Sequence, residues 1–226
     1  MRISRAPEFL AATVRVVDRH FADFLRLWLA VRSVRGWLRM PDAYLLYRLA
    51  RSEPGAGKVV EIGSAWGRSS VFLAAGCRDA GREGLIAIDP HTGDEWFLAD
   101  AELPPFDSYD EFLANLTRVG VGEWVEPLVM TSDQAAAAVP IQPIRLLFID
   151  GSHTYEAVSR DIQNWVPRLV DRGIVIFDDY PNPDPTVGVR RAVDELIASG
   201  LVEPTLRASF NLVWTRRQPS QGALPS

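Results

Sequence analysis

Short, mostly apolar runs alternate with stretches of helical periodicity from residue 58 onward. Runs of this kind are typical of parallel strands that are covered on both faces. Five such strands are expected, at Val59–Ile62, Leu85–Ile88, Val125–Met130, Leu146–Ile149 and Ile174–Phe177. Helices are expected at Ser69–Ala80, Ser108–Val119, Gln134–Ala138, Tyr155–Leu169 and Val189–Ser199, then a segment Val202–Leu206 and a strand Asn211–Thr215. This alternation predicts a three-layer α/β domain with right-handed crossovers.

The N-terminal region repeats apolar residues every three or four positions across residues 8–34, which predicts an amphipathic helix. The simpler interpretation is a helix packed on the domain's own core. A dimer seam or a lid over a substrate is the alternative, because a repeat of this kind also suits packing between helices. A second helix is expected at Pro41–Arg51. We therefore expect a helical lid or dimerisation segment at 1–52, the α/β domain at 53–216 and a flexible tail at 217–226.

The composition and net charge exclude several classes of protein. The chain has 226 residues, of which 47% are hydrophobic and 23% charged, and these proportions exclude a disordered or fibrous protein. A net charge of −5 without a Lys/Arg run argues against a nucleic-acid partner. Charges at Arg15, Asp18 and Asp23 interrupt the apolar N-terminal region, so we expect no membrane span or leader. The single cysteine, Cys77, favours a reducing, cytoplasmic setting.

A glycine-containing loop follows the first strand, where ligands of open α/β sheets bind. The strand carries Glu61, the loop has Gly63 and Gly67, and Ser69 opens a helix whose free N–H groups attract anions. Ala65 stands where a dinucleotide fingerprint needs a further glycine. An amino group against Glu61 and a carboxylate at the helix start would suit a zwitterionic amino-acid moiety.

The second and third strands also end in polar residues. Asp89 lies about twenty residues beyond the glycine loop, the position at which a carboxylate binds a ribose diol. Ser132 either contacts an adenine edge or caps the next helix. His91 opens a long irregular segment that suits a lid or substrate wall, and we expect at most a substrate contact from it. Trp66 and Trp96 are candidate stacking surfaces.

Acidic residues follow the fourth and fifth strands, in Asp150-Gly-Ser-His153 and Asp178-Asp179. Neighbouring parallel strands bring these side chains to one edge, where three carboxylates repel one another unless a cation binds. Oxygen ligands of this kind suit Mg²⁺ or Mn²⁺. His153 suits a general base, since its pKa lies near neutral pH, although it is also a candidate metal ligand. The alternative is a capped helix beside a salt-bridged Asp pair.

Together these motifs resemble the class I S-adenosylmethionine-dependent O-methyltransferases, and most closely the macrocin O-methyltransferase-like group (methyltransferase domain 24), metal-dependent enzymes that methylate sugar hydroxyls. The resemblance spans about residues 36–216 and rests mainly on the Asp-Gly-Ser-His and Asp-Asp sequences. It implies a Rossmann-like fold with a seven-stranded, mostly parallel sheet, helices on both faces and additional N-terminal helices.

The resemblance also implies a role for each motif. The methionine part of the cofactor would contact Glu61, Gly63 and Ser69, the ribose Asp89, and the adenine Ser132. Mg²⁺ or Mn²⁺ would bind Asp150, Asp178 and Asp179, with His153 as general base and Asp150 as its catalytic companion. The implied reaction is methyl transfer from S-adenosylmethionine to a hydroxyl of a sugar or glycoside. Catechol-like or phenolic acceptors are one alternative, and a non-catalytic cofactor-binding scaffold is another. A homodimer is expected.

Overall fold

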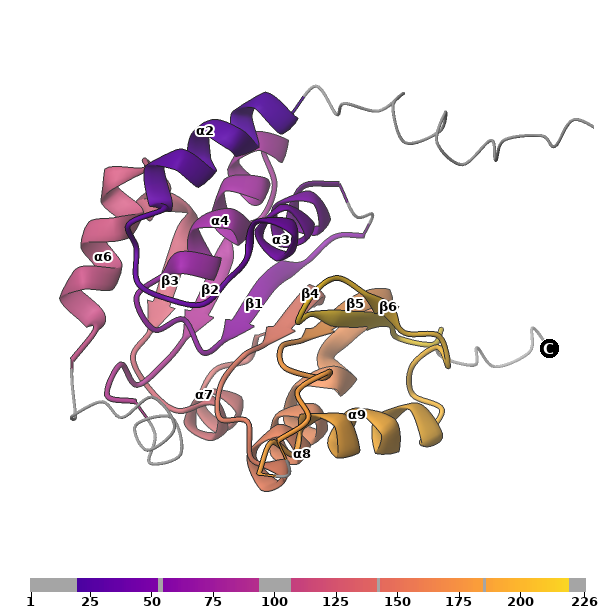
Figure 1. Ribbon diagram of the computed structural model, residues 1–226. Coiled ribbons are helices and arrows are strands. Elements are labelled where there is room, and N and C mark those ends of the chain that lie inside the picture. The colour runs from indigo at the N-terminus through magenta and orange to yellow at the C-terminus, as the bar shows by residue number, and fades with distance from the viewer. Residues whose placement is uncertain (1–19, 53–54, 94–106, 142, 185, 220–226) are drawn as a thin grey trace, which may run out of the picture.

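A seven-stranded sheet forms the centre of the protein in a computed structural model that describes residues 20–52, 55–93, 107–141, 143–184 and 186–219 (Figure 1). The strands are β1 Lys58–Ile62, β2 Leu85–Ile88, β3 Val125–Leu128, β4 Ile144–Ile149, β5 Leu169–Phe177, β6 Arg207–Ala208 and β7 Val213–Arg216. Their order is β3-β2-β1-β4-β5-β7-β6. The first five are parallel, whereas β7 runs antiparallel to β5 and β6. The predicted Rossmann-like fold is confirmed.

Helices cover both faces of the sheet (Figure 1). The first face carries α2 Phe21–Val31, α3 Met40–Ser52, α4 Arg68–Ala80 and α6 Tyr109–Arg118, and the second α7 Ser132–Ala138, α8 Tyr155–Trp165 and α9 Val189–Ala198. Short 3₁₀ turns lie at Gly122–Trp124 and Val166–Arg168. Successive strand residues alternate between the two cores: Val59 packs with the first group of helices and Val60 with the second.

The N-terminal helix packs on the domain's own core, as the simpler interpretation holds. Phe24, Leu27 and Val31 of α2 are buried, and the Phe24 ring lies 5.6 Å from that of Phe72 in α4. Helix α2 spans Phe21–Val31, whereas the predicted helix spans residues 8–34. Residues 8–19 of the predicted helix lie outside the described residues. A lid or dimerisation role for residues 1–52 stays a prediction.

Several element boundaries differ from those predicted. Helix α8 ends at Trp165 rather than at Leu169, because Pro167 lies in the following 3₁₀ turn and cannot donate the hydrogen bond that continues a helix. Strand β5 begins at Leu169, earlier than expected. In the segment after α9, Val202 makes a single bridge to Arg217, and the two-residue strand β6 forms farther along the chain.

Within the part of the chain that the structure describes, none of the helices is both long and apolar enough to cross a membrane.

Candidate functional site

One cavity of about 840 Å³ opens at the carboxyl ends of the parallel strands. The residues that line it come from the loops after β1 to β5, from the segment before α3 and from the loop between β6 and β7. This is the edge where the sequence predicts a ligand site. Among the predicted residues, Gly63, Ser69, Asp89, Ser132, Asp150, His153, Asp178 and Asp179 line the cavity.

Close backbone contact explains the glycine after β1. Gly63 has a φ of 87°, and a Cβ at this position would collide with the backbone carbonyl of Asp150 at the end of β4. Gly67, with a φ of 84°, precedes α4 and packs against the Phe112 ring. The loop after β1 is thereby held directly against the loop that carries the acidic cluster.

Asp89 fastens the glycine loop to the end of β2. Its Oδ2 accepts hydrogen bonds from the backbone N–H groups of Ser64 at 2.8 Å and Ala65 at 2.7 Å, and its Oδ1 accepts one from His91 at 2.6 Å. A carboxylate accepts about four hydrogen bonds, so three backbone donors leave room for a ligand hydroxyl. Asp89 therefore holds the glycine loop in place and also lines the cavity.

Glu61 is a buried carboxylate on β1. Its Oε2 accepts a hydrogen bond from the Ser70 hydroxyl, and its Oε1 has no hydrogen-bond partner among the described residues. Burial raises the pKa of Glu61 to about 8, although hydrogen bonds from Ser69 and Ser70 lower it in part. Glu61 itself is fully buried and is not among the residues that line the cavity, whereas Ile62 and Gly63, the next two residues, are.

Ser132 hydrogen-bonds to Asp161, a residue that sequence reasoning missed. Asp161 lines the cavity and is buried, and burial raises its pKa to about 6 while the Ser132 hydroxyl lowers it in part. The cap of α7 is Thr131, which forms a reciprocal capping box with Gln134, so the capping alternative for Ser132 is wrong. Asp161 lies on the buried face of amphipathic α8, beside Val158, and this unusual place for a charge was a usable signal.

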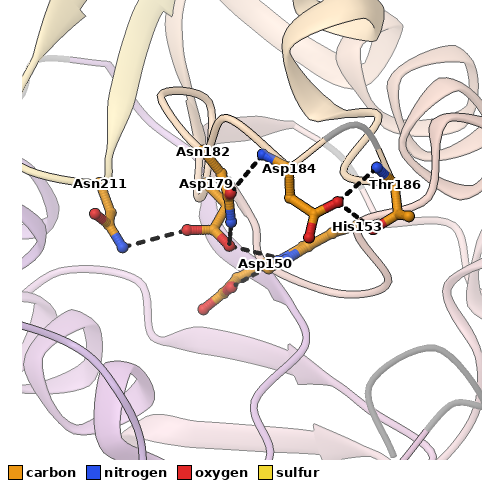
Figure 2. A network of polar contacts seen from close by, with 7 residues as sticks. All are labelled: Asp150, His153, Asp179, Asn182, Asp184, Thr186 and Asn211. Atoms are coloured by element: carbon orange, nitrogen blue, oxygen red, sulfur yellow. Dashed lines mark hydrogen bonds and ion pairs between the residues drawn. The ribbon is translucent and has the colours of Figure 1, made fainter. Parts of the chain in front are cut away.

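The acidic cluster forms where β4 and β5 end. One ligand atom from each of Asp150, His153 and Asp178 lies within 4.8 Å of the others. His153 bridges two carboxylates, since its Nε2 lies 3.4 Å from Asp150 Oδ1 and its Nδ1 lies 3.3 Å from Asp179 Oδ2 (Figure 2). Asp179 itself has a φ of 55° and accepts hydrogen bonds from the side-chain amides of Asn182 and Asn211. Asp179 is the one predicted metal ligand outside the group of three.

Mutual repulsion is visible in the pKa values of this cluster. Burial raises the pKa of Asp178 well above its usual range, and the charges of Asp150 and Asp179 raise it further. Burial lowers the pKa of His153, but its hydrogen bonds to Asp150 and Asp179 outweigh this and raise it to about 10. Carboxylates gathered in this way, with an imidazole beside them, fit the ligand preferences of a divalent cation.

The sequence also suggests three ring side chains as substrate contacts: His91, Trp66 and Trp96. His91 is buried, and its Nδ1 lies 2.9 Å from the hydroxyl of Ser108, which lines the cavity. Trp66 lines the cavity, where its ring centroid lies 6.4 Å from that of Trp37. Trp96 lies outside the described residues. A direct substrate contact by His91 stays a prediction.

Comparison with known families gives one match over more than half of the chain. A family model described as a methyltransferase domain matches residues 60–180. The uncharacterized protein y4gI of Sinorhizobium fredii is 27% identical over 211 residues, which cover 92% of this chain and 21% of that protein. The chain therefore spans about a fifth of the length of this curated relative.

Solved structures share the fold at low sequence identity. The O-methyltransferase NovP has a TM-score of 0.68 and 20% identity, with 79% of this chain and 80% of NovP covered. An O-methyltransferase from Bacillus cereus in complex with SAH has a TM-score of 0.62 and 17% identity, with 93% and 96% covered. CalS11, a TDP-rhamnose 3'-O-methyltransferase of calicheamicin biosynthesis, has a TM-score of 0.55 and 20% identity, with 92% and 98% covered.

Proposed function

Because the chain belongs to the methyltransferase domain family, whose model spans residues 60–180, we propose that this enzyme transfers a methyl group from S-adenosylmethionine to a hydroxyl of a sugar or glycoside. One observation carries the proposal: a single cavity joins the loop of Gly63 and Asp89 to the cluster of Asp150, His153 and Asp178. A nucleoside-bearing donor and a hydroxyl-bearing acceptor thus have adjoining sites, and holding two reactants together accounts for much of the catalysis of such a transfer.

The donor fits the residues after the first three strands. Asp89 has free acceptor capacity for the ribose hydroxyls, and Glu61 offers its Oε1 to the amino group of the methionine part. Ser69, in the first turn of α4, lines the same wall. The adenine then lies toward Ser132 and Asp161, whose carboxylate accepts a hydrogen bond from an exocyclic amino group.

The acceptor hydroxyl fits the acidic cluster. Asp150 and Asp178, with His153 or Asp179, would hold Mg²⁺ or Mn²⁺. A divalent cation bound there supplies positive charge that lowers the pKa of the acceptor hydroxyl and of His153. With Asp150 taken up by the cation, Nε2 of His153 would be free to accept the hydroxyl proton, while Asp179 holds Nδ1 and fixes the direction of the ring.

A sugar is the acceptor class that we favour. CalS11, which shares the fold, is described as a methyltransferase of TDP-rhamnose. The size of the chain and its short N-terminal helices also resemble the mycobacterial methylmannose polysaccharide 1-O-methyltransferase, so a methylated mannose polymer is one candidate within this class. Catechol-like acceptors form the alternative, and a scaffold that binds cofactor without turnover is the alternative from another class.

Calorimetric titration with S-adenosylhomocysteine is the first test. We expect one-to-one binding at micromolar concentration, followed by Mg²⁺-dependent methylation of sugar probes. Absence of binding at millimolar ligand contradicts the proposed donor. Tight binding without turnover of any sugar or diol favours the scaffold alternative.

The cytoplasmic location and the homodimer expected from the sequence remain predictions. Light scattering coupled to size-exclusion chromatography measures the oligomeric state directly.

A further inference from the structure

A second buried carboxylate lines the cavity, far in sequence from the motifs described above. Asp42, in the first turn of α3, has 1% of its surface exposed. Its Oδ2 accepts a hydrogen bond from the backbone N–H of Asn211 at 3.4 Å, whereas its Oδ1 has no hydrogen-bond partner among the described residues. A buried carboxylate oxygen without a donor is unfavourable, so Oδ1 is suited to a donor that a ligand brings.

Asn211 connects this carboxylate to the acidic cluster. Its side-chain amide donates a hydrogen bond of 3.2 Å to Asp179 Oδ1, and Asp179 in turn contacts His153 (Figure 2). Only one residue therefore separates Asp42 from Asp179. Asp42 and Asp179 thus line the same cavity and are joined through the hydrogen bonds of Asn211.

Aromatic side chains line the same cavity. Trp37 lines it with 67% of its surface exposed, and the Trp66 ring, which also lines the cavity, lies 6.4 Å away between centroids at an interplanar angle of 55°. The guanidinium of Arg39 lies 5.3 Å from the Phe210 ring centroid, so the segment before α3 and the loop before Asn211 lie together. An aromatic face beside a hydrogen-bond acceptor suits a sugar ring, which has an apolar C–H face and hydroxyls at its edge.

Resting on the proposed methyltransferase function, we propose that Asp42 determines acceptor specificity by accepting a hydrogen bond from a hydroxyl that is not methylated, while Trp37 covers the apolar face of the same ring. The acceptor class is then an uncharged ring with at least three hydroxyls or equivalent donors. A catechol has two adjacent hydroxyls, both used at the acidic cluster, and leaves Asp42 without a donor. An anionic group at this position is repelled by the Asp42 carboxylate.

The substitution Asp42→Asn tests this role with minimal change of shape. The new carbonyl oxygen keeps the hydrogen bond from Asn211, and a neutral NH₂ group replaces the charged acceptor that faces the ligand. The ligand hydroxyl then loses a charge-assisted hydrogen bond and accepts only a weaker one from the amide. With methyl α-D-mannopyranoside as the sugar probe, S-adenosylmethionine and Mg²⁺, we expect KM to rise about tenfold or more with kcat nearly unchanged. Turnover of catechol, the two-hydroxyl probe, should stay the same. Trp37→Ala should raise KM for the sugar probe.

The controls separate this inference from the proposed function. Asp110→Asn, at an exposed position of α6, is the matched charge change and should leave both acceptors unaffected. Thermal melting and affinity for S-adenosylhomocysteine should match the wild type in every variant. An equal change for both probes in Asp42→Asn, or a wild type that methylates catechol and ignores the sugar, overturns the inference. A wild type that does not bind S-adenosylhomocysteine defeats the proposed function, and the inference with it.

Discussion

Glu61 is surrounded by protein rather than water, so its protonation state depends on what binds beside it. With a pKa raised to about 8 by burial, it carries a proton in the free protein at neutral pH. A cationic amino group at Oε1 stabilises the carboxylate, and the proton is then released to solvent. Cofactor affinity should therefore increase as the pH rises toward 8 and level off above it.

Proton release at Glu61 can be counted. At pH 7 we expect about one proton released per S-adenosylhomocysteine bound, measured by calorimetry in buffers of different ionisation enthalpy. Glu61→Gln has no proton to lose, so it should release almost none and bind the ligand more weakly. Equal release by the wild type and this variant would falsify the assignment of Glu61 to the amino group.

Gly63 allows a comparison with a second glycine of similar backbone angle. Gly63→Ala places a Cβ against the Asp150 carbonyl and should cost about 3 kcal/mol or more of unfolding free energy. Gly81→Ala, at the end of α4 with a φ of 61° and no heavy atom within 4 Å of the added Cβ, should cost only about 1 kcal/mol. Urea denaturation measures both, and equal losses would mean that the contact with Asp150 is not tight.

Some residues of the site can be predicted from the sequence, and others cannot. Asp150, His153 and Asp178 directly follow apolar strands, and adjacent parallel strands end at the same edge, so their meeting follows from topology. Asp42 and Asn211 are 169 positions apart, and nothing local indicates that one is buried against the other. Burial of an unpaired oxygen is a property of the folded chain.

Among the secondary-structure elements, the strands that helices cover on both faces are the easiest to predict from the sequence. Apolar runs locate β1, β2 and β4 closely, because burial on two faces leaves little choice of residue. The short strand β6 has only two residues, and no periodicity can reveal so short an element. Its pairing with β7 depends on the sheet edge that β5 already provides.

Helix α2 offers a test between core packing and a lid. Phe24 is fully buried against Tyr44, Tyr47 and Phe72, so Phe24→Ala should destabilise the fold by about 3–5 kcal/mol. Leu29→Ala, on the exposed face with 53% exposure, should change stability by less than about 0.5 kcal/mol. Thermal and urea unfolding provide the comparison. A Phe24 variant of normal stability but altered acceptor KM would instead identify α2 as a lid.

The proposed donor and cation sites open into one cavity but are formed by different side chains. Asp178→Asn removes a carboxylate from the cluster, so Mg²⁺-dependent turnover should fall at least about tenfold and need more Mg²⁺. Its affinity for S-adenosylhomocysteine should stay within about twofold of the wild type, as should that of wild type treated with chelator. Undiminished turnover in chelator contradicts a cation role.

The family match does not include Trp37, Asp42 and Asn211, the residues proposed to recognise the acceptor or to hold Asp42 in place. Residues 60–180 contain the glycine loop and the acidic cluster, whereas Trp37 and Asp42 precede this span and Asn211 follows it. Under the proposed function, these flanking residues contact the acceptor, whereas residues 60–180 contain the donor site and the acidic cluster. The proposal therefore predicts that exchanging these two flanking stretches for those of another family member, while residues 60–180 are kept, changes which acceptor is methylated.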